Sequence, residues 1–329
     1  MKIFFFPVLV IDELMKQLKP VELVSLSLCS KNAHAFVKTF ANTNKGLQID
    51  LSFYYDVYFI SFRRHPIHAS IRVTSNQPRF CGPSGLESIH GLDYSFDKTG
   101  QLYTCWQDVV QGCQMTTNYV CDLLKIPVTT ISIYRADDLW LLDFAQQRQE
   151  QKLKSLRSSN PNISAQAYSI IMSYNATERL EVTAVPREDY RFVGKLSTAK
   201  TLIIQWGHWI TREHLLGLES SFAQLRCTRL TIADINASLR SWLNGGLPNL
   251  KYLDIDLRIC NNRIYEGVRD RLEAVRGEIR YKWDEFKSAA RFNSNAFHIR
   301  GDDGIVATVM NDGFLFMMAV LPNLNGNLV

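Results

Sequence analysis

Residues 247–255 read Leu247-Pro248-Asn249-Leu250-Lys251-Tyr252-Leu253-Asp254-Ile255, with leucine at every third position as far as Leu253. This is close to the spacing of leucine-rich repeats, in which a short strand alternates with a helical segment. Tripeptides similar to Leu253-Asp254-Ile255 stand at Leu180-Glu181-Val182, Leu202-Ile203-Ile204 and Leu230-Thr231-Ile232. The last residues of these four tripeptides are separated by 22, 28 and 23 positions. Such units bury their apolar faces only when they stack on one another. We therefore predict an α/β fold in which residues 46–295 form an irregular leucine-rich-repeat-like solenoid.

The segments between these strands are expected to be helical. One helix is predicted from Thr211 to Phe222, and another carries Ile235, Leu239, Trp242 and Leu243 on one face and ends at Gly245-Gly246. Outside the repeat, strands are predicted in residues 47–62 and 128–134, which are aromatic or β-branched.

The C-terminal part has two patterns. Residues 265–291 are highly charged and carry apolar residues at Val268, Leu272, Val275 and Ile279, a spacing that predicts a helix. Residues 296–329 form a separate segment of C-terminal strands and tail, in which the tight-turn pairs Asp303-Gly304 and Asp312-Gly313 predict a β-meander.

Residues 1–45 predict a module of three short helices. Apolar residues recur at helical spacing from Val10 to Leu18, Pro20 suits the first turn of a second helix, and Ser30 can cap a third. A module of about 40 residues buries too little surface to be comfortable alone, so it is expected to lean on a neighbour or a partner.

The composition is that of a globular protein, with 46% hydrophobic and 21% charged residues in a chain of 329. The seven cysteines are odd in number and include no C-x-x-C pair, which favours reduced thiols in the cytoplasm or nucleus. The apolar run 314–321 is too short to span a membrane, and no membrane partner is expected. Pro7 and Asp12-Glu13 argue against a signal peptide.

No catalytic site, cofactor or metal is predicted. The sequence lacks the G-x-S-x-G, H-E-x-x-H and Walker motifs, so we expect no enzyme. Cys105, Cys113 and Cys121 are spaced too widely for zinc, and His65-x-x-His68 has no matching pair. A net charge of +5 is modest, so no nucleic-acid partner is expected, although Arg148, Lys152, Lys154 and Arg157 leave that option to test.

The N-terminal module resembles an F-box. The residues that carry the resemblance are Phe6-Pro7, Val10, Leu14, Leu18, Pro20, Leu23, Leu26 and Ser30-Lys31. Cys29 stands where valine is common, and the usual tryptophan is absent.

Residues 180–260 resemble the F-box associated type 2 domain of nematode F-box proteins. This resemblance is carried by Leu230-Thr231, Asp234-Ile235-Asn236, Leu239, Trp242, Asn249-Leu250 and Leu253, and residues 302–308 look like the tail of the same proteins.

The resemblance implies a substrate-recruiting adaptor of a Skp–cullin–F-box ubiquitin ligase. The F-box would bind a Skp-type subunit and, through it, a cullin, while the rest would hold an unidentified protein target for partner enzymes to modify. The candidate contacts to the Skp-type subunit are Pro7, Leu9, Leu14, Leu18, Pro20 and Leu23. Trp206 and Trp209, which follow a predicted strand, are candidate target contacts.

A rival hypothesis is a leucine-rich-like scaffold whose N-terminal helices only cap the solenoid, as terminal units of such arrays must. The two differ at the first helix. A cap buries its apolar residues, whereas an unpaired F-box exposes an apolar docking patch.

Overall fold

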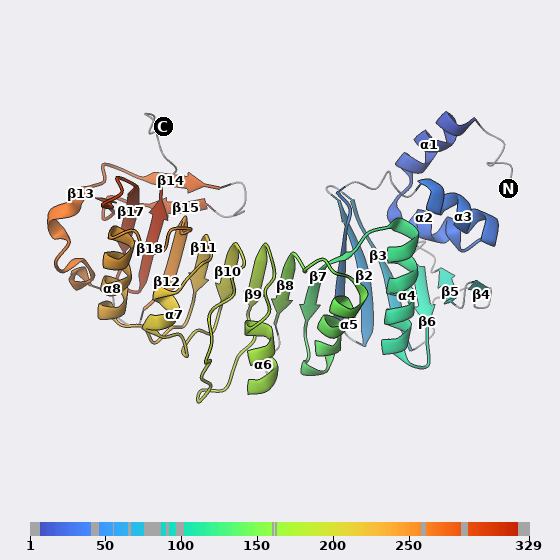
Figure 1. Ribbon diagram of the computed structural model, residues 1–329, viewed down its shortest axis with the longest axis horizontal. Coiled ribbons are helices and arrows are strands. Elements are labelled where there is room, and N and C mark those ends of the chain that lie inside the picture. The colour runs from blue at the N-terminus through green and yellow to red at the C-terminus, as the bar shows by residue number, and fades with distance from the viewer. Residues whose placement is uncertain are drawn as a thin grey trace. The chain divides into compact units, whose positions relative to one another are not determined.

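A computed structural model describes residues 7–40, 46–54, 56–64, 67–75, 87–89, 92–96, 102–159, 161, 163–257, 261–283 and 289–321. The chain divides into two compact units, Met1–Leu153 and Lys154–Val329. Each unit is described by itself, with the elements labelled as in Figure 1.

The first unit begins with the three predicted helices, α1 (Val8–Gln17), α2 (Pro20–Ser27) and α3 (Lys31–Phe40). Pro20 opens α2, and the Glu22 carboxylate accepts a hydrogen bond of 2.6 Å from the backbone N–H of Lys19. The Ser30 hydroxyl accepts one of 3.1 Å from the N–H of Ala33, which caps α3 as predicted. The three-helix prediction is therefore confirmed.

A mixed sheet follows these helices. Its strands are β1 (Gln48–Tyr54), β2 (Val57–Arg64), β3 (Ile67–Thr74), β4 (Glu87–Ile89), β5 (Leu92–Phe96), β6 (Leu102–Cys105) and β7 (Val128–Ile133). Within this unit they stand in the order β7-β1-β2-β3-β6-β5-β4. The β1, β2 and β3 strands are antiparallel, whereas β7 runs parallel to β1 and β6 parallel to β3. The strands predicted in residues 47–62 and 128–134 are confirmed.

Helix α4 (Val109–Leu124) connects the N-terminal helices to this sheet. It packs against α3 on one side and against β2, β3 and β6 on the other, while α5 (Trp140–Arg148) packs against β7. The Asp108 carboxylate caps α4 by accepting hydrogen bonds of 2.9 and 3.1 Å from the N–H groups of Val110 and Gln111. The N-terminal module thus leans on a neighbouring layer, as its small size required.

Tyr119 of α4 joins the N-terminal helices α2 and α3 to α4 by hydrogen bonds. The Tyr119 hydroxyl lies 2.7 Å from Ser27 Oγ in α2 and 3.2 Å from His34 Nδ1 in α3. We expect Tyr119→Phe to lower the free energy of unfolding by about 1 to 2 kcal/mol, because each of two part-buried hydrogen bonds contributes about 0.5 to 1.5 kcal/mol. Urea unfolding followed by circular dichroism measures this loss. An unchanged midpoint would show that these hydrogen bonds do not hold the module.

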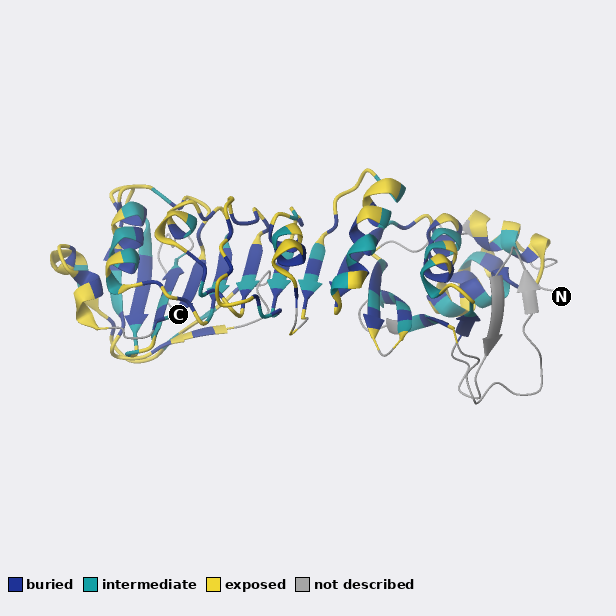
Figure 2. Cartoon of the chain, turned by 90° about the horizontal axis from the view of Figure 1, so that it is seen from below, coloured by how far each residue is buried: buried dark blue, intermediate teal, exposed yellow. Residues whose placement is uncertain are grey.

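The second unit begins with five parallel strands. These are β8 (Ser155–Ser158), β9 (Arg179–Val182), β10 (Thr201–Ile204), β11 (Phe222–Leu225) and β12 (Tyr252–Asp256). Their pairing is regular, so that one row across the sheet holds the buried residues Leu156, Leu180, Leu202, Ala223 and Leu253. The intervening helices are α6 (Ala165–Met172), α7 (Arg212–Leu216) and α8 (Ile232–Leu243). Figure 2 shows the buried strands and the exposed outer turns of the helices.

The strand predicted at residues 230–232 is wrong. The third parallel strand of the predicted series is β11, and Thr231 instead caps α8 by accepting a hydrogen bond of 3.3 Å from the N–H of Asp234. Because Asp234 stands three residues after Thr231, the pair forms a capping box, which outweighs the β-branched character of Thr231 and Ile232. The helix predicted from Thr211 to Phe222 is correspondingly shorter, since Phe222 begins β11.

The C-terminal strands β16 (Phe297–Arg300), β17 (Val306–Asn311) and β18 (Leu315–Val320) confirm the predicted meander. They are antiparallel neighbours, and β18 pairs antiparallel with β12, so the meander extends the sheet of parallel strands. Gly304 and Gly313 have φ of +82° and +98°, which explains the Asp-Gly pairs at the two turns.

The helix predicted over residues 265–291 is wrong. This segment holds the 3-10 turns η4 (Asn262–Tyr265) and η5 (Arg269–Arg271), strand β13 (Leu272–Ala274), and the hairpin β14 (Ile279–Lys282) and β15 (Ala289–Phe292). Gly267 and Gly277 have φ of +72° and +83°, which no α-helix accommodates. The hairpin packs Phe292 and the adjacent Trp283 in one cluster with Phe222 and Tyr252 of the sheet.

A leucine-rich solenoid over residues 46–295 is not confirmed. Strands β8 to β12 pair in parallel, but β1, β2 and β3 are antiparallel and residues 279–292 are a hairpin. What the structure shows is a mixed α/β chain with N-terminal helices and many-stranded sheet. No helix in the described parts of the chain is both long and apolar enough to traverse a membrane.

Candidate interaction surfaces

The first helix exposes an apolar surface, made of Pro7, Val8, Leu9, Val10 and Leu14, which we call the α1 apolar surface. Val8 is 68% exposed, Leu9 80% and Leu14 41%, whereas Ile11 and Met15 are buried against the rest of the module. Exposing apolar side chains to water costs free energy, so a group of exposed apolar side chains is typical of an interface.

Some of the predicted contacts to the Skp-type subunit are exposed and others are buried. Pro7, Leu9 and Leu14 are exposed and Leu18 is half-buried, whereas Pro20 and Leu23 are buried. Pro20 begins α2, and Leu23 on the next turn is packed inside the three-helix module, so both have a packing role here. The prediction did not include Val8 and Val10, although both belong to the exposed surface; the apolar run before Asp12 was the available signal.

The two tryptophans proposed as target contacts also divide. Trp206 is 38% exposed just after β10, whereas Trp209 is 2% exposed. The Trp209 ring lies 5.5 to 6.0 Å from the ring centroids of Tyr168, Tyr190, Phe192 and His214. Trp209 therefore belongs to an aromatic core, because edge-to-face packing at these distances stabilises an interior.

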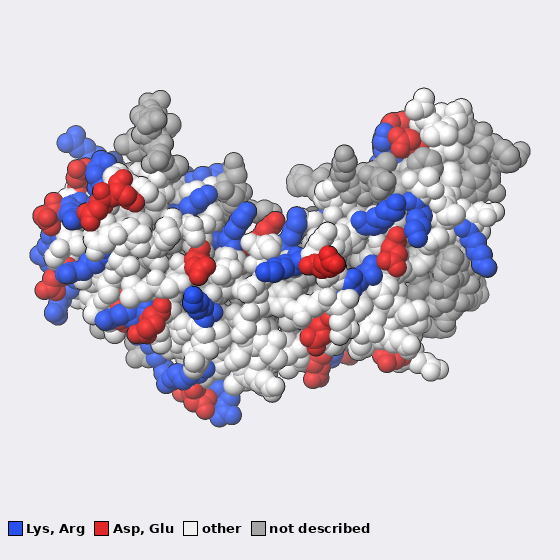
Figure 3. Space-filling model, viewed as in Figure 1, with Lys and Arg blue, Asp and Glu red and all other residues white. Residues whose placement is uncertain are grey.

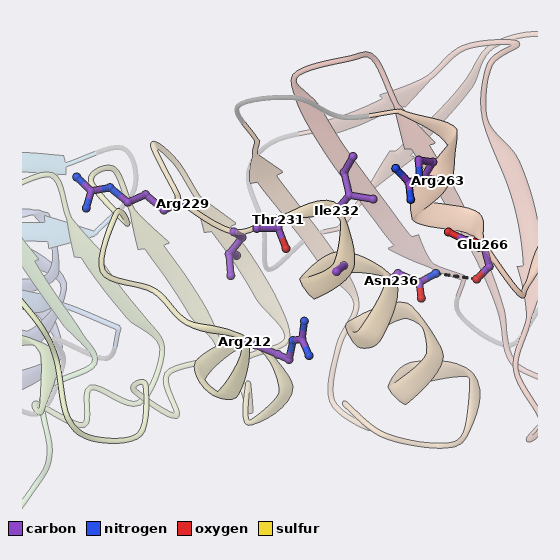
Figure 4. A pocket seen from close by; sticks show the side chains of 9 residues that line it. Arg212, Arg229, Thr231, Ile232, Asn236, Arg263 and Glu266 are labelled. Carbon is purple, nitrogen blue, oxygen red and sulfur yellow. Dashed lines mark hydrogen bonds between the residues drawn. The ribbon is translucent and has the colours of Figure 1, made fainter.

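A pocket of about 730 Å³ lies at the beginning of α8. It is lined by Arg212, Arg229, Leu230, Thr231, Ile232, Ala233, Asn236, Arg263 and Glu266. Figure 4 shows Arg212 below Thr231 and Arg263 beyond Ile232, while the Arg229 side chain extends away from both, so that the three arginines come from separate segments of the chain. Sequence reasoning missed this pocket, since its lining is spread over 55 positions from Arg212 to Glu266.

The capping box of α8 also fixes one arginine of this pocket. Asp234 Oδ2 accepts hydrogen bonds of 2.8 and 2.7 Å from the N–H and hydroxyl of Thr231, and its Oδ1 accepts one of 2.7 Å from Arg212 Nε. Burial alone would raise the pKa of Asp234, but the hydrogen bonds from Thr231 and Arg212 together hold it below its ordinary value. Asp234 is therefore ionised at neutral pH and pairs with Arg212.

The opposite wall is tied to α8 through backbone oxygens. The Asn236 amide donates hydrogen bonds of 2.7 Å to the carbonyl of Ile264 and 2.9 Å to that of Glu266, and Arg240 donates one of 2.9 Å to Glu266 as well. Gly267 lets this wall approach so closely, because a Cβ there would collide with the Arg240 guanidinium. Hydrogen bonds thus hold both sides of the pocket in place.

Comparison with known protein families supports both resemblances. Residues 3–45 match the F-box domain, and residues 195–255 match the F-box associated family. These two segments are therefore similar to an F-box and to an F-box associated domain. A Caenorhabditis elegans protein, Skn-1 dependent zygotic transcript 15 protein, is 22% identical over 342 aligned residues, which cover 95% of this chain and 94% of that protein. No solved structure matches the chain.

The residues that carry the F-box associated resemblance now have structural roles. Thr231 and Asp234 form the capping box of α8, and Asn236 donates hydrogen bonds to the carbonyls of Ile264 in η4 and of Glu266 after it. Ile235, Leu239, Trp242, Leu250 and Leu253 are all buried in the unit. The pocket therefore includes several of the residues that carry this resemblance, although Arg263 and Glu266 lie outside residues 195–255.

Side-chain placement bears on metal binding and on nucleic-acid binding. Within the described residues no three His, Cys, Asp or Glu side chains come together as metal ligands, and His65 and the side chain of His68 lie outside those residues. Figure 3 shows acidic side chains interspersed among the basic ones on the face in view. Such mixing lacks the single-sign stripe that nucleic-acid binders present.

Proposed function

We propose that this chain is a substrate adaptor of a Skp–cullin–F-box ubiquitin ligase. The F-box and F-box associated families are adaptor and interaction domains, generally without enzymatic activity, which supports this role. In the proposal the α1 apolar surface binds a Skp-type subunit, that subunit connects the chain to a cullin, and the second unit holds a protein target in the cytoplasm or nucleus.

The observation that carries the proposal is the exposure of α1. Four consecutive residues, Pro7 to Val10, are exposed at the start of a helix whose remaining apolar residues mostly pack inward. Covering one leucine is worth about 1.5 to 3 kcal/mol, so a few such side chains supply most of a partner's affinity.

The same observation weakens the rival hypothesis of a capping role. A terminal cap presents polar residues outward and buries its apolar ones. Val8 and Leu9, at 68% and 80% exposure, are the reverse of that pattern. The limits predicted for the segments, 1–45, 46–295 and 296–329, stay a prediction.

Reconstitution tests the proposal. The full chain, mixed with a purified Skp-type subunit and a cullin, is expected to elute from a size-exclusion column as one complex of all three, and to lose the cullin when the Skp-type subunit is omitted. Elution of the chain alone in both mixtures would refute the adaptor role.

A further inference from the structure

We infer that the pocket at the start of α8 binds an acidic segment of a protein, through carboxylate side chains flanked by apolar ones. This inference rests on the proposed function, since it assigns the target site of the adaptor to one place in the second unit. The pocket volume of about 730 Å³ falls in the range of about 300 to 1,000 Å³ that is usual for ligand sites.

The charges of the lining determine the sign of the ligand. Arg212 is paired with Asp234 at 2.7 Å, but among the residues that the structure describes Arg229 and Arg263 form no ion pair. Glu266 is the single acidic residue of the lining, and its backbone oxygen accepts from Asn236 and Arg240. Two exposed arginines are thus available to an anionic ligand, and the positive end of the α8 dipole adds to their field.

The same charges favour a carboxylate over a phosphate. The lining has three arginines and Glu266, and Arg212 is paired with Asp234, which leaves one positive charge in excess. A singly charged carboxylate balances this excess, whereas a phosphate of nearly two charges would be repelled by Asp234 and Glu266. Ile232 and Ala233 supply apolar surface in the lining, which suits an apolar side chain next to the acidic one.

The test uses the full chain and two arrays of short synthetic peptides. One array places glutamate at several positions among varied apolar and polar residues, and the other carries glutamine at the same positions. A third set replaces glutamate by phosphoserine. The wild-type chain is expected to retain a subset of the glutamate peptides and to release the matching glutamine peptides. Retention should weaken as salt is raised, because the charges are exposed.

The variant Arg229→Gln/Arg263→Gln is expected to bind the retained peptides at least about tenfold more weakly, since it removes both available charges. The matched control is Lys195→Gln/Arg276→Gln, which removes two exposed positive charges that do not line the pocket and should leave binding unchanged.

Three results would overturn the inference: equal retention of glutamate and glutamine peptides, equal binding by wild type and the pocket variant, or retention of the phosphoserine peptides alone. Binding of the Skp-type subunit, measured on the same proteins, separates this inference from the proposed function. Loss of peptide binding with intact Skp-type docking concerns the pocket alone, whereas a wild-type chain that lacks Skp-type docking refutes the adaptor role.

Discussion

Leu9→Asp is expected to abolish binding of the Skp-type subunit without unfolding the chain. Leu9 is 80% exposed in the isolated chain, so the charge is accommodated in water there. In the proposed complex the same position is covered, and the change loses about 1.5 to 3 kcal/mol of apolar burial while also desolvating a carboxylate. We expect the dissociation constant to rise by about 100-fold or more. Titration calorimetry measures it, and thermal unfolding checks the fold.

The control for this variant is Val193→Asp. Val193 is 97% exposed in the second unit, so it introduces the same charge at an apolar position outside α1. Its affinity for the Skp-type subunit should equal that of the wild type. Leu14→Asp, at a position 41% exposed on the same helix, should behave as Leu9→Asp does. If both α1 variants retain full affinity, the α1 apolar surface is not the docking site.

Elements with strong local signals were predictable from the sequence. The three N-terminal helices followed from helical spacing, Pro20 and the Ser30 cap, and the meander followed from two Asp-Gly turns. Each of these signals acts within a few residues, so no knowledge of distant contacts was needed.

Elements that depend on distant contacts were not predictable. β11 is only four residues long, and its place is set by pairing with β10 and β12. In residues 265–291 the apolar spacing imitates a helix, but Phe292 is buried in a cluster with Phe222 and Tyr252, which are far away in the sequence. Tertiary packing of this kind overrides weak local preference.

The candidate sites follow the same rule. The apolar start of the chain pointed to α1, but only the structure separates exposed Leu9 from buried Leu23. The motif around Thr231 marked the beginning of α8 as characteristic, whereas the arginines of the pocket come from three separate segments. The hydrogen bonds of Asp234 to Arg212 and of Asn236 to the carbonyls of Ile264 and Glu266 join these segments, and a single sequence does not reveal them.

Arg226→Leu is expected to destabilise the second unit by about 3 to 5 kcal/mol, the cost of leaving a buried charge without its partner. The Arg226 Nη1 atom lies 2.8 Å from Asp254 Oδ1 and 2.7 Å from Asp256 Oδ1, and its Nη2 donates to Asp254 Oδ2. The Asp254 side chain is 4% exposed, so water cannot replace the guanidinium. Thermal unfolding should show a melting temperature lower by roughly 10 °C for a unit of this size.

The pH dependence of this loss identifies its cause. Burial raises the pKa of Asp254 above its ordinary value even though Arg226 opposes the shift, so removing Arg226 should raise it further. A carboxyl group whose folded pKa exceeds its unfolded one contributes stability at low pH that is lost as pH rises through the folded pKa. The loss of unfolding free energy in Arg226→Leu should therefore be small near pH 4 and grow towards neutrality.

Arg226→Leu/Asp254→Leu, which removes both buried charges, should recover most of the stability at pH 7. A deficit that is independent of pH, or a double variant no more stable than the single one, would mean that lost packing rather than an unpaired Asp254 weakens the unit.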